Sequence, residues 1–161
     1  MLSWKQFKDT MAVRAFAFFK VPLLFSVRPT VLQNSIEKTV VKIPLCRKTK
    51  NHLNVMYFGA LTIGGEAAVG LGAVQAIEKS GKRIDFLFKD FKADFRKRAE
   101  GDVHFVCEQG PEVLALIEKC VTSGQRENQT FKSFALVPSV SETEHVADFE
   151  VTLSVKLRQK K

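Results

Sequence analysis

The segment from Val55 to Ile77 constrains the fold more than any other part of the chain. It reads VMYFGALTIGGEAAVGLGAVQAI, and Glu66 and Gln75 are its only strongly polar side chains. The segment is long enough to cross a bilayer, but a carboxylate near mid-membrane costs on the order of 3 kcal/mol. Its glycines lower the hydrophobicity, and both flanks are basic, so the charges specify no orientation. We therefore expect no membrane span here, but a buried helix over about residues 60–79 that ends at Gly81.

The interior glycines of this helix indicate tight packing. Each one costs about 0.5–1 kcal/mol of helix stability relative to alanine. Four of them lie inside the expected helix: Gly64, Gly65, Gly70 and Gly72. Close approach of a backbone would explain them, so we expect a sheet that curls around the helix and holds it on its concave side.

The N-terminal region resembles a signal peptide only at first sight. Residues 12–27 are apolar, but Arg14, Lys20 and Pro22 interrupt the run, and no small-residue cleavage site follows. An amphipathic helix ending near Pro22 fits better, because apolar side chains recur at helical spacing: Trp4, Phe7, Met11, Ala15 and Phe18.

The remainder of the chain alternates between apolar and polar residues as strands do. The turn at residues 100–102 would make the strands on either side of it neighbours in the sheet. The sequence therefore predicts one α+β domain over residues 1–161, with an N-terminal helical extension over 1–30 and a core over 37–157. The expected core elements are strands over 37–45, 83–99, 102–109, 130–140 and 145–157, and a short helix over 111–121.

Charge and cysteine content limit the class of partner and the compartment. The net charge of +8 indicates an anionic partner: a nucleic acid, a membrane surface or a phosphorylated small molecule. Cys46, Cys107 and Cys120 are odd in number and have no metal-ligand spacing, which is typical of free thiols in the cytoplasm. We expect no metal site, because His104 and His145 have no cysteine or carboxylate at ligand spacing.

Three positions around the glycine-rich helix resemble a known motif. Asn51, the Tyr57–Gly59 triplet and Glu66 match the spacing of Asn, His-Gly-Gly and Asp/Glu in acyl-CoA thioesterases of the phenylacetate-pathway type, with Tyr57 and Phe58 replacing His and Gly. DFRKRAEGDV, residues 94–103, is similar to the family's Phe-x-x-Pro-Ala-x-x-Gly-Asp-Val signature, with Arg98 replacing the proline. The resemblance covers about residues 37–157, is closest to an uncharacterised branch of predicted thioesterases, and implies the hotdog fold.

The residues of this motif have the chemistry that thioester hydrolysis needs. Glu66 lies among apolar neighbours that should raise its pKa, as suits a general base or a nucleophile. The backbone amides of Phe58 and Gly59, at the start of the helix, could hold an oxyanion. Asn51 could orient the water or the substrate carbonyl. We expect substrate contacts from Tyr57 and Thr62, and contacts to the phosphates of coenzyme A from Arg96, Lys97 and Arg98.

The resemblance also implies an assembly and a substrate. In hotdog thioesterases the asparagine and the carboxylate come from opposite subunits, so we expect a homodimer, possibly paired into a tetramer. The acyl-CoA thioester is then the substrate, and no cofactor is expected.

Other interpretations remain open from the sequence. Glu66 can be a structural carboxylate at the dimer interface, and Asn51 a loop or capping residue. Tyr57 and Phe58 favour a hotdog dimer that binds acyl-CoA or a lipid without hydrolysing it. A basic nucleic-acid-binding domain has charge in its favour, but the chain has one Trp and one Tyr for stacking and no recognised motif, so no nucleic acid is expected.

Overall fold

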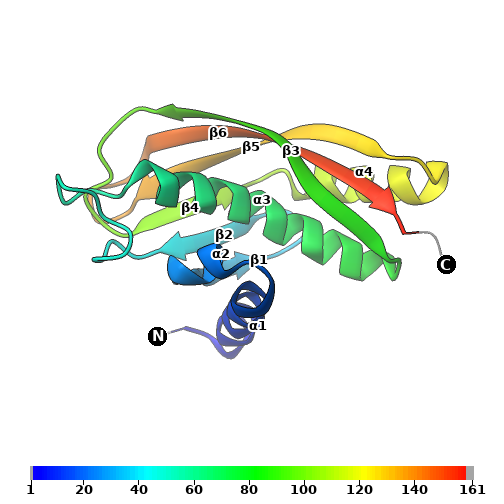
Figure 1. Cartoon of the computed structure of the whole chain (residues 1–161), viewed down its shortest axis with the longest axis horizontal. Helices are drawn as coiled ribbons and strands as arrows, with labels where there is room; N and C mark the ends of the chain where they lie inside the picture. The colour runs from blue at the N-terminus through cyan, green and yellow to red at the C-terminus, as the bar shows by residue number, and fades with distance from the viewer. Residues whose placement is uncertain (1, 159–161) are drawn as a thin grey trace.

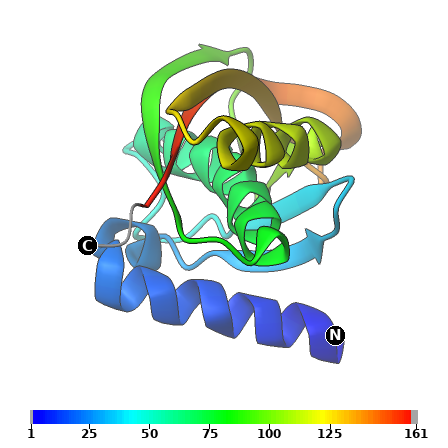
Figure 2. The same ribbon diagram turned by 90° about the vertical axis from the view of Figure 1, so that its right-hand side faces the viewer.

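The core of the molecule is one antiparallel sheet that curls around a long helix, α3 (Phe58–Ser80). The computed structural model describes residues 2–158. Figure 2, viewed from the end of the molecule, shows the sheet arching over α3, which confirms the predicted α+β architecture and the concave placement of the helix. The strands, in the spatial order β1-β2-β4-β5-β6-β3, are β1 (Thr30–Asn34), β2 (Thr39–Ile43), β4 (Val103–Cys107), β5 (Glu127–Val137), β6 (Ser141–Leu157) and β3 (Ile84–Phe95).

Aromatic rings of the sheet explain two of the glycines of α3. A Cβ atom on Gly64 would lie 2.3 Å from the ring of Phe105, and one on Gly65 would lie 2.7 Å from the ring of Phe149. The close approach predicted from the glycines is therefore real, but side chains make it and the sheet backbone does not. The helix ends as expected at Gly81, which has the left-handed conformation (φ 63°) that glycine adopts without strain.

Helix α3 also has the length and apolar composition of a membrane span. Its most apolar 18-residue window has a mean hydropathy of 1.4, and half of that window is buried inside the structure. The buried side chains, among them Ala68 and Val69, pack in the same core as the inward side of β6. The composition of α3 is therefore accounted for by its place in the core.

One predicted strand pairing is wrong. The turn at residues 100–102 does not make β3 and β4 neighbours: β4 pairs with β2 and β5, and β3 pairs along its whole length with β6 at the edge of the sheet. The connection over 96–102 is too long for a tight hairpin, and it is tied down elsewhere. The amides of Arg96 (2.9 Å) and Lys97 (3.1 Å) both donate to the carbonyl of Val146. The Met56 amide donates to the carbonyl of Ala99 (2.9 Å).

The predicted helix over 111–121 is present as α4 (Gly110–Ser123), whose buried side joins the core that contains α3. Strand β1, in contrast, was not expected from the sequence. It is short, and only its pairing with β2 makes it a strand.

The N-terminal extension forms two helices, α1 (Trp4–Lys20) and α2 (Pro22–Ser26). Pro22 begins the second helix, where its missing N–H costs nothing. Helix α1 lies outside the sheet, beside the β1 edge (Figure 1). The predicted amphipathic helix is thus confirmed, but its apolar side does not join the core: Trp4, Phe7, Met11 and Phe18 are exposed.

Candidate active site

Asn51 shapes the loop that leads into α3. Its side-chain oxygen accepts hydrogen bonds from the amides of Leu53 (2.9 Å) and Val55 (3.4 Å), and its own amide donates to the Val55 carbonyl (2.9 Å). Such bonds from an asparagine to the following residues fix a tight turn. The oxygen of Asn51 is thereby committed to the loop, which leaves its side-chain NH2 as the group to offer a substrate.

The first turn of α3 presents open backbone donors. The Ala60 and Leu61 amides both donate to the carbonyl of Tyr57, so the helical hydrogen bonds start there. The amides of Phe58 and Gly59 precede these bonds, as the first donors of any helix do. The ring of Tyr57 folds over this turn: a Cβ on Gly59 would lie 2.6 Å from it. Gly59 therefore makes room for the Tyr57 ring beside the two amides.

Glu66 lies two turns further along α3, on the side of the helix that the sheet leaves open. Its side chain is exposed in the single subunit, yet the apolar surroundings desolvate the carboxylate and raise its pKa above the ordinary value of 4.5. Within residues 2–158, no hydrogen bond or ion pair engages this carboxylate. The hydroxyl of Thr62, one turn earlier, is occupied, because it donates to the Gly59 carbonyl (2.9 Å).

A surface hollow beside the start of α3 brings together most of the predicted site residues. It is open to solvent and lies between the loop over 51–58 and the connection over 95–99. Glu66, Gly59 and Thr62 are not part of its lining. A single subunit therefore separates the predicted carboxylate from the residues predicted to bind the substrate. Six predicted residues line the hollow: Asn51, Tyr57, Phe58, Arg96, Lys97 and Arg98.

The three basic residues of the hollow differ in what they contact. Arg96 forms ion pairs with Asp148 and, at 3.6 Å, with Asp94, and Lys97 forms one with Glu144. Arg98 is exposed and has no carboxylate partner in the part of the chain that the structure describes. Arg98 is therefore the residue of the three with a charge available to an anionic ligand.

Two further features of this region were not predicted as part of the site. Phe95, the first residue of the signature over 95–103, lines the hollow, and its ring lies 6.1 Å from that of Phe58. His145 Nδ1 lies 2.7 Å from Asp148 Oδ1, and the imidazole stacks on Phe134. Irregular pairing of β5 and β6 near His145 brings these side chains together, and period-2 alternation does not reveal it.

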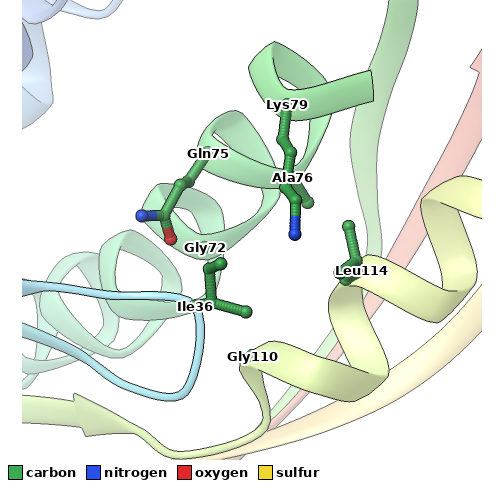
Figure 3. A pocket seen from close by; sticks show the side chains of 7 residues that line it. All are labelled: Ile36, Gly72, Gln75, Ala76, Lys79, Gly110 and Leu114. Atoms are coloured by element: carbon green, nitrogen blue, oxygen red, sulfur yellow. The ribbon is translucent and has the colours of Figure 1, made fainter.

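A second hollow, shown in Figure 3, lies between the far half of α3, the start of α4 and the β1–β2 turn. Its volume of about 10 Å³ is at the lower limit for one water molecule. Gly110 packs directly against the β1–β2 turn in its wall, since a Cβ there would lie 1.8 Å from the carbonyl oxygen of Ile36. This hollow is too small for an acyl chain or a coenzyme.

The curled sheet around α3 defines a protein of the hotdog fold, and solved structures agree. The chain matches a Chlorobaculum tepidum protein of unknown function (TM-score 0.81, 9% identity, 95% of this chain and 97% of that one). It also matches a Pseudomonas aeruginosa protein of unknown function described as a probable thioesterase (TM-score 0.75, 17% identity, 92% of this chain and 96% of that one). A third match is a Haemophilus influenzae thioesterase (TM-score 0.68, 10% identity, 94% of this chain and 92% of that one). At these identities the likeness shows the fold alone.

The chain belongs to the family described as "Domain of unknown function (DUF4442)", whose model matches residues 9–156. A comparison with curated protein sequences gives no match. The specific likeness to the phenylacetate-pathway branch remains a prediction from the motif.

Proposed function

We propose that this protein hydrolyses acyl-CoA thioesters, with Glu66 as the catalytic carboxylate. The observation that carries the proposal is the position of Glu66: it lies on the open side of the glycine-rich helix, without a hydrogen-bond or ion-pair partner among residues 2–158, and desolvation by its apolar surroundings raises its pKa. A general base that must accept a proton from water gains from a raised pKa.

In the proposed reaction Glu66 takes a proton from water as the oxygen attacks the thioester carbonyl. The negative charge that develops on the carbonyl oxygen is held by the open amides of Phe58 and Gly59. The tetrahedral intermediate then collapses, the carbon–sulfur bond breaks, and the proton on Glu66 passes to the departing thiolate of coenzyme A. The products are the free acid and the thiol.

Helix geometry favours a site shared between two subunits. Seven residues separate Gly59 from Glu66, which is about 10 Å along a helix at 1.5 Å per residue. The attacking water must lie about 3 Å from the carbonyl carbon, and the amide donors must lie about 3 Å from the oxygen of that same carbonyl. We therefore propose a homodimer in which Glu66 of one subunit faces Asn51, Phe58 and Gly59 of the other. Strand β3, an edge strand with exposed Leu87, Phe91 and Phe95, offers the surface for that contact.

A second function, binding of acyl-CoA without hydrolysis, is favoured by one observation. The ring of Tyr57 folds over Gly59, next to the proposed oxyanion donors. If that ring stays in place when acyl-CoA binds, the carbonyl cannot reach the amides.

The test is a thiol-release assay over a panel of acyl- and aryl-CoA thioesters, run together with direct binding of the same panel by calorimetry. We expect release of coenzyme A by the wild-type protein. Tight binding with no thiol release would establish the binding function instead. Salt-sensitive binding of oligonucleotides without affinity for coenzyme A would contradict both.

Substitution of Asn51 separates its structural role from its chemical role. Aspartate keeps an oxygen to accept from the Leu53 and Val55 amides, so Asn51→Asp should leave Tm nearly unchanged. Because it removes the NH2 donor, it should lower kcat by about 10–100-fold. Asn51→Ala should lower both Tm and kcat. Thermal melts and kcat measured on the two variants check this, and a wild-type kcat for Asn51→Asp would indicate a purely structural residue.

Arg98 is expected to contribute to coenzyme A affinity and not to the chemical step. Arg98→Ala should raise KM for acyl-CoA about 5–20-fold, the loss of one charge-assisted hydrogen bond, with kcat unchanged. Steady-state kinetics measure both constants. The control is Arg83→Ala, which removes an exposed arginine outside the hollow and should leave KM unaltered.

A further inference from the structure

Helix α1 is attached to the sheet by its polar side. Gln6 donates to the Leu32 carbonyl (2.6 Å), and the Arg14 Nε donates to the Pro29 carbonyl (2.9 Å). Between them the Thr10 hydroxyl accepts from the Val31 amide (2.9 Å). These side chains, four residues apart, satisfy the open backbone edge of β1. Ala17 and Val13 on this side also pack against the protein, whereas the large apolar side chains of Trp4, Phe7, Met11 and Phe18 are exposed.

The opposite side of α1, continued by α2, is an exposed apolar surface that we call the N-terminal apolar face. Trp4 is 73% exposed, Phe19 76% and Leu23 66%. Aromatic rings contact one another along it: Trp4 stacks on Phe7, and Phe18 lies against both Phe19 and Phe25. Figure 2 shows α1 along the outside of the molecule, with no element of the chain beyond it. The face consists of Trp4, Phe7, Met11, Phe18, Phe19, Leu23 and Phe25.

The charges around this face are positive. Lys8, Lys20 and Arg28 are exposed and have no carboxylate partner among the residues that the structure describes. Asp9 is the single acidic residue of α1, and it is half-buried. The whole chain carries a net charge of +8. A basic rim around an aromatic face is complementary to a surface that is apolar inside and anionic outside.

We propose that α1 and α2 dock this protein on the surface of an anionic phospholipid bilayer. A helix with Trp, Phe and Leu on one side and Lys nearby lies in the plane of the membrane interface, with its apolar side in the acyl boundary and its ammonium groups at the phosphates. Long lysine side chains next to the apolar face reach the headgroups.

The position of α1 leaves the proposed active site free. Strand β1, which α1 covers, and strand β3 form opposite edges of the sheet. No residue of α1 or α2 lines the hollow beside Arg98, so docking through these helices uses other side chains than the proposed active site does. Membrane binding and thioester hydrolysis are separate functions of different surfaces, so one can fail in an experiment without the other.

The experiment is co-sedimentation of the full chain with sucrose-loaded vesicles. One set of vesicles is pure phosphatidylcholine. The other contains phosphatidylcholine with about 30% phosphatidylserine, which gives the vesicle a negative surface. We expect binding to the anionic vesicles that weakens with salt and is much weaker with phosphatidylcholine alone. The double variant Phe7→Glu/Met11→Glu should lower the partition coefficient at least about tenfold, because it places charges in the buried side of the bound helix. The control Val140→Glu changes an apolar residue in the β5–β6 turn that is even more exposed than Phe7 and Met11, and it should bind as the wild type does.

Two results would overturn the proposal. One is wild-type protein that remains in the supernatant with both kinds of vesicle. The other is a change in the oligomeric state of Phe7→Glu/Met11→Glu, measured by analytical ultracentrifugation, while its vesicle binding stays that of the wild type. This result would show that a second copy of the chain covers the N-terminal apolar face. Circular dichroism of the double variant confirms that it is folded, as expected for substitutions at exposed positions.

Discussion

Glu66→Gln is expected to lower kcat for acyl-CoA hydrolysis by about 10²–10⁴-fold, the range typical of a lost general base. Glutamine keeps the size and polarity of the side chain but cannot take a proton from water. KM should change little, because the proposed binding residues lie in the hollow and not on this part of α3. The control is Glu78→Gln, which removes an exposed carboxylate from the same helix and should leave kcat unaltered. Hydrolysis at the wild-type rate by Glu66→Gln would contradict the mechanism.

The raised pKa of Glu66 makes a second readout available. Because the base must be ionised, kcat/KM of the wild type should fall on the acid side with an apparent pKa above 4.5. The same shift acts on stability. A carboxyl whose pKa is raised by folding favours the folded state below its unfolded pKa, and this contribution is lost as the pH rises through the folded pKa. Glu66→Gln should therefore melt at a higher temperature than the wild type near pH 7, and at the same temperature near pH 4. Equal melting temperatures of the variant and the wild type at both pH values would mean that the apolar surroundings do not perturb this carboxylate.

The sequence predicts which helices and strands form better than it predicts which of them lie side by side. Helix α3, its end at Gly81 and five of the six strands follow from periodicity and glycine placement, which are local properties. The pairing of β3 with β6 is decided by packing across the sheet, which local patterns do not encode, and β1 exists only because β2 lies beside it. The residues of the hollow could be named from their motif. That Arg98 has a free charge while Arg96 and Lys97 are paired depends on Asp148 and Glu144, far along the chain.

Helix α1 illustrates the limit of amphipathic patterns. The apolar spacing of Trp4, Phe7 and Met11 correctly predicts a helix, but the pattern does not say which side faces the protein. The sheet edge of β1 needs hydrogen-bonding partners, and Gln6, Thr10 and Arg14 supply them. The side with these polar residues, together with Val13 and Ala17, is therefore the inner side, and the large apolar side chains are left for another surface.

Gly64→Ala and Gly72→Ala, two identical substitutions in one helix, are expected to change stability in opposite directions. In both, alanine gains about 0.5–1 kcal/mol of helix preference. At Gly72 the new Cβ would meet its nearest neighbour, a methyl of Thr39, at an ordinary 3.7 Å, so the variant should be more stable by about that amount. At Gly64 the Cβ would lie 2.3–2.5 Å from three ring atoms of Phe105.

Phe105 has no room to retreat, because its side chain is fully buried in the core between α3 and β4. Overpacking of this kind costs about 1–3 kcal/mol, occasionally more, and exceeds the gain in helix preference. Gly64→Ala should therefore lower Tm by several degrees, at about 2–4 °C per kcal/mol for a domain of this size, while Gly72→Ala raises it. Thermal and urea unfolding of the two variants measure the difference. If both variants were stabilised, the Phe105 ring would not be held against α3, and the sheet would not enclose the helix as tightly as its glycines require.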